Sequence, residues 1–370
     1  MFTLAWRNLT HERTRLAISV GGVALAVLLI LVMSGLFAGA EQHAVVYMER
    51  QPADLWLMQA GVENIHMASS ILSPEAVQRV AQSPGVEAAV GVLYASAGIE
   101  VQDTLIPTYL FGVASDAPFG GPWSMAAGSA ELSVSQIVID RALAARYDLA
   151  IGDQVSVMGY KLTIGGLSEE TFGIATSIAF VNKTALAAAV GVSPQAASYV
   201  LVQATADQDL NQLAAALATS VPEANVMTRD AFIASEQDLI RQMGTDVILA
   251  MSSVAYVIGL LVIGLTIYTA VLEKARDYGV LKALGATTSR LVRVVVAQAF
   301  VAAGLGFLVG VGLAFTVASQ ITRVLPEMLI LIEPARLLRE VLILSVITVL
   351  AALLPLGRLV RLDPLIAFRA

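Results

Sequence analysis

The sequence has no cysteine, little charge and few histidines. Among 370 residues Cys is absent, only 14% are charged, and His occurs three times. A disulfide framework, a thiolate nucleophile and a thiolate metal site are therefore excluded. The spacing of His11, His43 and His66 is not that of a metal cluster. The pair His66-Met67 could ligate haem or a soft metal, but an ordinary surface turn is the preferred interpretation, so no metal and no cofactor are predicted.

Nucleotide-binding and hydrolase motifs are also missing. None of the four lysines, Lys161, Lys183, Lys274 and Lys282, follows a glycine as a P-loop requires. The sequence contains no G-x-S-x-G nucleophile motif. We therefore predict no catalytic residue: the chain is not an enzyme, and any ATP hydrolysis belongs to a separate chain.

Long apolar runs dominate what is present. Hydrophobic residues make up 57% of the chain, against about 45–50% in soluble domains, and the mean hydropathy is +0.76. Four windows, 16–37, 247–272, 291–321 and 341–359, are long enough to cross a bilayer. The first ends in "FAGA", which resembles a signal-peptide cleavage site, but its apolar run exceeds the 7–15 residues of a signal core, so a retained helix is preferred.

Basic residues set the expected orientation. They cluster before the first window, between the second and third, and after the fourth, which places both termini in the cytoplasm and the chain in the cell's inner membrane. The long segment 41–242 then lies outside, and it carries 8 Lys/Arg against 21 Asp/Glu. Asp246, Arg293 and Glu340 lie at span ends, where snorkelling explains them.

The expected fold is an α-helical membrane protein with four transmembrane helices and a large extracytoplasmic α+β domain inserted between helices 1 and 2. The predicted division is a cytoplasmic amphipathic segment 1–15, helix 1 at 16–40, the extracytoplasmic domain 41–242, helix 2 at 243–272, a cytoplasmic coupling loop 273–290, helix 3 at 291–321, a short outer connection 322–340 with room for an interfacial helix, helix 4 at 341–359, and a cytoplasmic tail 360–370.

The segment 41–242 has the pattern of a folded domain. Strands are predicted at 53–58, 86–101, 104–113, 137–140, 154–167 and 198–204, the fifth folded as a hairpin around Gly159. Ser73 followed by Pro74 is typical of a helix start. Residues 229–242 form an amphipathic helix that continues into the second span, which would join movement of the domain to movement of the span.

The spans themselves carry almost no internal charge, which disfavours an ion-coupled carrier. The third span contains a stripe of small residues, Ala302, Gly306 and Gly310. Small residues on one helical face allow two helices to approach closely. Packing within the chain is the preferred interpretation, and a dimer face is the alternative.

The loop between spans two and three reads "EKARDYGVLKALGATTSRL". As a helix it places Tyr278, Leu281 and Leu284 on one stripe, with Gly285 as its C-cap and Thr288 or Ser289 opening the next helix. A solvated turn would explain the charged residues of this loop but not its apolar stripe. The apolar stripe beside the membrane instead indicates a docking surface for a cytoplasmic partner.

The loop residues "EKARDYGVLKALGAT", the ending "RLDPLIAFRA" and the opening "AWRNLTHERTRLAISVGGVALAV" resemble ABC transporter permeases of the MacB/FtsX-like (type VII, mechanotransmission) superfamily. Within the outer segment, "ADLWLM" and "VIDRALAARYDLAIGDQVSV" are similar to the DevC/HrtB-type export permeases, which makes these the nearest members. The resemblance implies a permease subunit of an ABC exporter that pairs with a second protomer, as a homodimer or heterodimer, and with separate ATPase subunits. These drive the outer domain through the loop. A periplasmic adaptor is a further partner of some members, and nucleic acid is not one. The residues that match the coupling motif are Arg276, Asp277, Tyr278, Gly279, Leu281, Lys282, Leu284 and Gly285.

A second hypothesis comes from the same resemblance. Like FtsX proper, the chain would be a transmembrane regulator that transports nothing and activates an envelope hydrolase.

Overall fold

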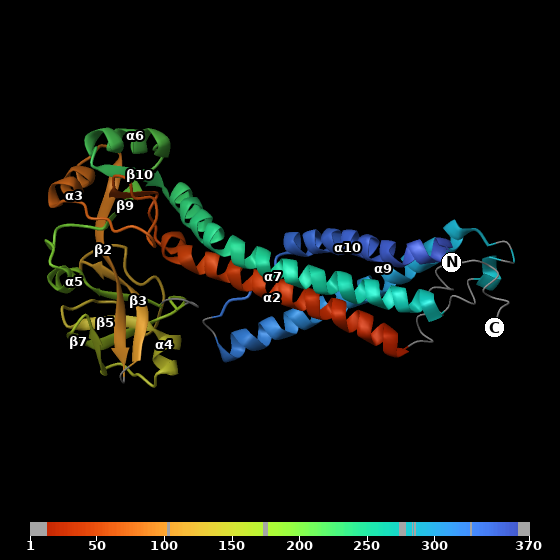
Figure 1. Cartoon of the computed structure of the whole chain (residues 1–370). Coiled ribbons are helices and arrows are strands. Elements are labelled where there is room, and N and C mark those ends of the chain that lie inside the picture. The colour runs from red at the N-terminus through yellow and green to blue at the C-terminus, as the bar shows by residue number, and fades with distance from the viewer. Residues whose placement is uncertain are drawn as a thin grey trace. The chain divides into compact units, whose positions relative to one another are not determined.

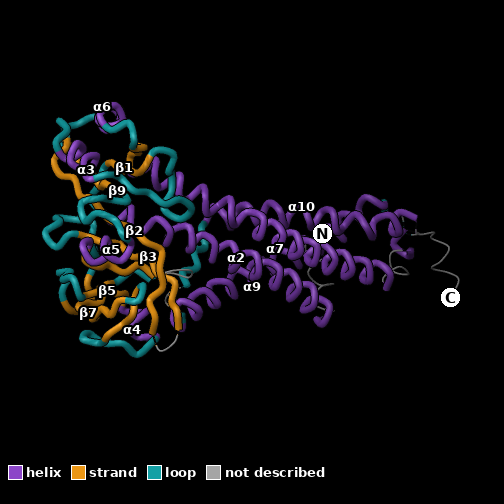
Figure 2. Tube along the Cα trace, turned by 60° about the vertical axis from the view of Figure 1, so that its left-hand side comes forward, coloured by secondary structure: helices purple, strands orange, loops and turns teal. Residues whose placement is uncertain are grey.

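A computed structural model describes residues 13–101, 104–172, 177–273, 279–282, 284, 286–325 and 328–361. The chain separates into two compact units (Figures 1 and 2). The helical unit comprises Met1–Ala38, Gly244–Leu325 and Ile330–Ala370, and the α+β unit comprises Gly39–Met243 and Pro326–Leu329. The α+β character predicted for the inserted segment is thus confirmed.

Four long helices supply the helical unit: α2 (Arg13–Arg50), α7 (Arg229–Glu273), α9 (Thr288–Val324) and α10 (Pro334–Arg361). Among the described residues, α2 from Leu16, α7 and α9 are long and apolar enough to cross a membrane. The fourth predicted window lies within α10, which has 28 residues. "FAGA" lies inside unbroken α2, and α7 is continuous from Arg229 as predicted.

Helices occupy both ends of the segment 322–340, which is predicted as an outer connection. Helix α9 continues to Val324, and α10 begins at Pro334, seven residues before the predicted start of the fourth span. Proline at the first position of a helix lacks only an N–H that would have no partner there, and its fixed φ suits the first turn. Pro334 therefore begins α10 inside the predicted connection, where the sequence left room for a helix.

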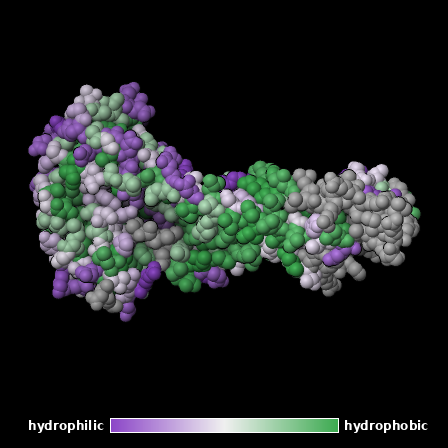
Figure 3. All heavy atoms as spheres, viewed as in Figure 1, coloured by the Kyte–Doolittle hydropathy of each residue, from purple (hydrophilic) through white to green (hydrophobic). Residues whose placement is uncertain are grey.

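The helices of this unit pack through small and branched apolar side chains. The core contains Val23 and Val27 of α2, Ile263 and Ile267 of α7, and Ala299 of α9, among others. Large apolar side chains also cover the outside of the helices, where the space-filling view is mostly hydrophobic (Figure 3). A monomer in water rarely exposes so large an apolar surface, so these helix faces require an apolar environment such as lipid.

Glu340 departs from its predicted position at a solvated span end. Its side chain is buried in α10, and its carboxylate accepts a hydrogen bond from the Tyr256 hydroxyl of α7 at 2.8 Å. Arg339 lies 3.3 Å from the other carboxylate oxygen. Two adjacent partners compensate for burial, so the acid does not have to reach the membrane surface.

The α+β unit is built on a ten-stranded sheet with the order β10-β1-β9-β2-β3-β8-β5-β7-β4, and β6 pairs with β2 and β7. Most neighbours are antiparallel, but β3 with β8 and β5 with β7 are parallel. The strands are β1 (Leu55–Gln59), β2 (Val86–Val101), β3 (Thr104–Val113), β4 (Met125–Gly128), β5 (Gln136–Asp140), β6 (Gln154–Val157), β7 (Tyr160–Ser168), β8 (Ser177–Asn182), β9 (Tyr199–Ala204) and β10 (Ala224–Thr228).

Four short helices cover the sheet: α3 (Pro74–Ala81), α4 (Arg141–Arg146), α5 (Lys183–Val190) and α6 (Leu210–Ser220). Strand alternation divides β1 between two cores. Leu55 and Leu57 pack with α3 and α6, whereas Trp56 and Met58 belong to the core on the other face. Both faces of this strand are buried, so its sequence is continuously apolar rather than alternating in polarity.

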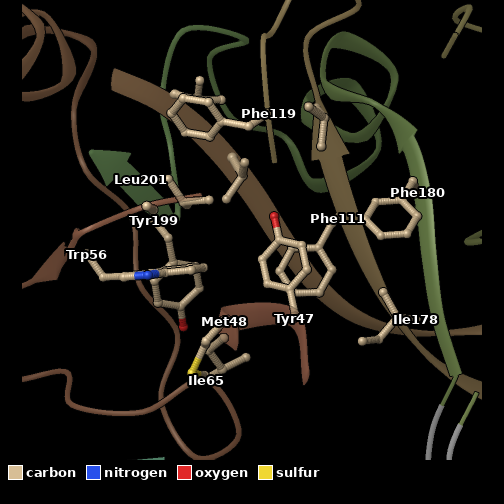
Figure 4. Packing of buried hydrophobic residues seen from close by; sticks show 14 of the residues in the cluster. Tyr47, Met48, Trp56, Ile65, Phe111, Phe119, Ile178, Phe180, Tyr199 and Leu201 are labelled. Carbon is tan, nitrogen blue, oxygen red and sulfur yellow. The ribbon is translucent and has the colours of Figure 1, made fainter. Parts of the chain in front are cut away.

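The other face of the sheet is covered by the last turns of α2 and the first turns of α7. Tyr47 of α2 stacks on Phe111 of β3 with ring centroids 3.8 Å apart, and Phe180 of β8 lies beside them (Figure 4). The Tyr47 hydroxyl donates to the Gly120 carbonyl at 2.7 Å. Because these residues belong to the sheet core, α2 extends ten residues beyond the boundary at 40 that hydropathy indicates.

Local signals in the sequence are confirmed. The Ser73 hydroxyl caps α3 by accepting from Ala76 N at 3.2 Å, and Pro74 is the first helical residue. Strands β6 and β7 form the predicted hairpin, in which Val157 pairs with Tyr160. Met158 and Gly159 in the turn have φ values of 51° and 82°. Positive φ at both central residues matches the right-handed twist of paired strands.

Candidate functional site

The predicted coupling surface is described only in part. Arg276, Asp277, Tyr278 and Gly285 lie outside the described residues. Residues 279–282 are helical, and the amide of Leu284 donates to the Val280 carbonyl at 3.0 Å. Gly279 is buried and Lys282 is half-buried, whereas Leu281 and Leu284 are 43% and 79% exposed. The described part therefore presents two leucines on its surface.

The turn after this segment differs from the prediction at its helix start. Thr287, rather than Thr288 or Ser289, is the N-cap of α9, and it makes no side-chain capping bond. Instead the amides of Arg290 and Leu291 donate to the Thr287 carbonyl at 2.9 and 3.3 Å. Thr287, Thr288 and Ser289 are all residue types favoured at a helix N-cap, so the sequence alone does not show which of them begins the helix.

The small-residue stripe of α9 lies against α2 of the same chain. Ala302, Gly306 and Gly310 are all buried. A Cβ placed on Gly306 would lie 2.6 Å from Val23 Cβ, and one on Gly310 would lie 2.8 Å from the Ala24 carbonyl oxygen. By contrast, a Cβ on Gly312 would meet no atom within 4 Å. The two buried glycines thus allow α9 and α2 to approach backbone to backbone.

A buried hydrogen-bonded pair in the α+β unit joins the loop before α3 to α7. Glu236 of α7 has no exposed surface, and one of its carboxylate oxygens pairs with Nδ1 of His66. The other oxygen accepts the backbone N–H of Ile65 at 2.8 Å. Both carboxylate oxygens are therefore occupied, which is the arrangement that makes a buried acid tolerable.

Tyrosines surround this pair. Tyr109 meets the His66 ring edge to face with centroids 5.0 Å apart. The Tyr199 hydroxyl donates to the Asn64 carbonyl at 3.4 Å. Burial raises the pKa of Tyr199 above its usual range, and the Glu236 charge raises it further. Tyr199 therefore remains a neutral donor. His66 is the only imidazole ring that contacts Glu236 among the described residues.

Beside the pair is a cavity of about 300 Å³, which we call the His66 pocket. Its wall is formed by residues of α2 between Ala40 and Tyr47, by Ile65, His66 and Met67, by β3 and β8, by Thr171, and by Ile240 and Met243 of α7. Most of these side chains are apolar. Among the described residues, no group of three or more His, Asp or Glu side chains could hold a metal ion.

Sequence reasoning singled out His66 and Met67 but missed Glu236. The missed signal is periodic: Phe232, Glu236 and Ile240 follow one another at intervals of four, so the acid stands in the apolar stripe of an amphipathic helix. Charged residues are almost never fully buried unless they are paired. An acid in that stripe therefore indicates a buried partner elsewhere in the chain.

Two family models together span most of the sequence. The model of the MacB-like periplasmic core domain matches residues 16–220, and that of the FtsX-like permease C-terminal region matches residues 249–364. The first covers more than half of the chain. The second contains the predicted coupling loop and the helices α9 and α10.

Known relatives align over nearly the whole length. An uncharacterised ABC transporter permease of Mycobacterium tuberculosis is 25% identical over 374 residues, covering 100% of this chain and 99% of that protein. HrtB of Staphylococcus haemolyticus, which is named as a hemin transport system permease, is 23% identical over 367 residues, covering 98% of this chain and 97% of its own.

Among solved structures, the periplasmic region of MacB from Actinobacillus actinomycetemcomitans matches with a TM-score of 0.38 and 10% identity, covering 48% of this chain and 89% of its own. The extracellular domain of the ABC-type transporter YknZ matches with a TM-score of 0.36 and 14% identity, covering 48% and 98%. The assignment rests on the two family models. By these matches the chain is a membrane protein that belongs to the MacB/FtsX-like family of ABC transporter permeases.

Proposed function

We propose that the chain is the permease subunit of an ABC exporter, in which a separate ATPase docks on the loop 273–290 and drives the α+β unit. The observation that carries the proposal is the length of α7. Its 45 residues run without a break from Arg229 to Glu273. At 1.5 Å per residue they span about 68 Å, roughly twice the hydrocarbon core of a bilayer.

A helix of that length has a mechanical consequence. One end of α7 contributes Phe232 to the core of the α+β unit, and the other end precedes the loop that carries Leu281 and Leu284. A continuous helix transmits displacement better than a jointed one, because every backbone hydrogen bond along it resists bending. Force applied at the loop would therefore reach the α+β unit through α7.

The proposed topology has four spans. Helix α10 is the fourth, both termini are cytoplasmic, and the α+β unit lies outside the inner membrane. Support comes from the distribution of basic residues, which cluster at the ends and in the loop. Two protomers and two ATPase subunits make up the working complex, as the resemblance to this family implies.

Docking is tested by making the two exposed leucines acidic. The double variant Leu281→Asp/Leu284→Asp, the matched control Val134→Asp and the parent chain are each tagged and purified from native membranes. Val134 is a surface residue of the α+β unit with 61% exposure. We expect ATPase activity to copurify with the parent and the control and to be lost from the double variant. Equal activity in all three would refute docking at this loop.

Topology is tested separately, because the chain has no cysteine of its own. Spheroplasts that contain single-cysteine chains, carrying Leu284→Cys or Ala216→Cys, are treated with a maleimide that does not cross membranes. Ala216 is exposed on α6. The proposal expects labelling at Ala216→Cys in spheroplasts and labelling at Leu284→Cys only after the membrane is permeabilised.

A further inference from the structure

The His66 pocket has a wall without formal charge. None of the described side chains that line it is Asp, Glu, Lys or Arg. Glu236 lies behind His66 and is paired with it. A charged ligand would lose its hydration in this pocket and gain no counter-charge, which costs far more than the apolar contacts return. The lining therefore selects uncharged molecules.

One polar atom of the wall is held in a fixed position. The Glu236 carboxylate can only accept, so the His66 proton that faces it is on Nδ1. In the neutral ring the remaining nitrogen, Nε2, is an acceptor, and the described residues offer it no hydrogen-bond partner. The bond from Ile65 N to Glu236 also fixes the carboxylate. A preorganised acceptor of this kind fixes the orientation of a bound ligand and also adds to its affinity.

The size of the pocket and the residues at its mouth further restrict the class of ligand that it can bind. A cavity of 150 Å³ lined by apolar side chains holds benzene, and the His66 pocket is about 300 Å³. Met67 and Met243 at its edge are 65% and 61% exposed. Methionine is unbranched and polarisable, so it adapts to ligands of different outline. Two exposed methionines at one mouth suit an aromatic or alicyclic guest of variable shape.

We propose that the His66 pocket binds an uncharged, largely apolar molecule about the size of two fused rings, which donates a hydrogen bond to Nε2 of His66. The site lies within the α+β unit, so binding requires neither the ATPase nor the loop 273–290. The double variant Leu281→Asp/Leu284→Asp is therefore expected to bind like the parent, and this separates failure of the pocket from failure of the docking proposal.

The test uses cysteine protection in the full-length chain in nanodiscs. Met67→Cys reports on the mouth, and Ala216→Cys on α6 is the matched control. Three probes share one ring system: 2-naphthol donates a hydrogen bond and is neutral, naphthalene has no donor, and 2-naphthoate is charged. Maleimide labelling rates are measured over a concentration series, with empty nanodiscs correcting for ligand held by lipid.

We expect 2-naphthol to slow labelling of Met67→Cys at concentrations about tenfold lower than naphthalene, as one added neutral hydrogen bond predicts. The naphthoate should be weaker still, and Ala216→Cys should be unaffected. Ala44 lines the pocket, so adding Ala44→Phe places a ring inside it and should abolish protection. The proposal is overturned if all three probes protect equally, if none protects, or if protection survives Ala44→Phe.

Discussion

Replacing Gly310 by alanine tests the packing of α9 on α2. The new methyl group would lie 2.8 Å from both the Ala24 carbonyl oxygen and Val27 Cβ. A backbone oxygen cannot rotate away, so the two helices must separate by about half an ångström to reach ordinary contact distance. Such overpacking typically costs about 1–3 kcal/mol.

Gly312, two residues along the same helix, is the matched control, because a Cβ there meets nothing within 4 Å. Alanine is about 1 kcal/mol better than glycine in a helix at either position. This gain is common to both variants. The difference in stability between Gly310→Ala and Gly312→Ala therefore isolates the steric cost, and we expect about 1–3 kcal/mol in favour of Gly312→Ala.

The assay is thermal exposure of a single buried thiol. Ser34 of α2 is 3% exposed, so Ser34→Cys in the cysteine-free chain should react with a fluorogenic maleimide only when the helical unit opens. The temperature of half-labelling should be about 5 °C lower for Gly310→Ala than for Gly312→Ala. Equal temperatures would refute backbone contact between α9 and α2. Equal temperatures with weaker self-association of Gly310→Ala would instead assign the stripe to a dimer face.

Three further predictions concern the α+β unit, with unfolding of the full-length chain followed by tryptophan fluorescence. Burial lowers the pKa of Lys183 from 10.5 to about 8, so between these values the unfolded state binds more protons and stability should rise with pH. Lys183→Met should remove that rise and increase the free energy of unfolding by up to about 3 kcal/mol at pH 7. An unfolding free energy of the parent chain that stays constant from pH 8 to 10 would contradict this. Asp140 caps α4 through Ala142 N at 2.6 Å and accepts the Thr171 amide and hydroxyl at 2.8 and 2.7 Å, so Asp140→Ala should cost about 3 kcal/mol, and a loss below about 1 kcal/mol would show that these bonds contribute little. Glu236→Ala should cost about 2–6 kcal/mol, because it leaves two donors, His66 and the Ile65 amide, without their acceptor at about 1–3 kcal/mol each. Glu236→Gln, which keeps one acceptor oxygen, should cost less; equal losses would show that the stability does not depend on the acceptor.

Much of the fold could be predicted because its signals are local. Strands β2 and β3 have the predicted bounds, since each is a long run of residues that favour β-structure. Strands β4, β8 and β10 were missed. Strand β8, "SIAFVN", is buried at every position, so it lacks the alternation that marks a half-buried strand. Its environment depends on β3 and β5, which are distant in sequence.

The candidate site could likewise be predicted only where its signals are local in the sequence. The stripe at Gly306 and Gly310 can be recognised in the sequence. The helix that packs on it cannot, because small residues allow close approach by many different helices. His66 stands out as a rare residue, yet its role depends on Glu236, which lies 170 residues away. Periodicity marks Glu236 as unusual without indicating what it meets.

The pairing of β1 with β10 also sets an order for biogenesis. Leu55 pairs with Thr228, and β1 lies between β9 and β10 in the sheet. During synthesis β1 emerges early, but β9 follows only after about 140 further residues and β10 after about 165, and such separations slow folding. Until then its apolar edges are unpaired, which is the state in which strands aggregate. Maturation of this permease should therefore depend on chaperones at the side of the membrane where the unit folds, and a nascent chain arrested before residue 224 should remain protease-sensitive there.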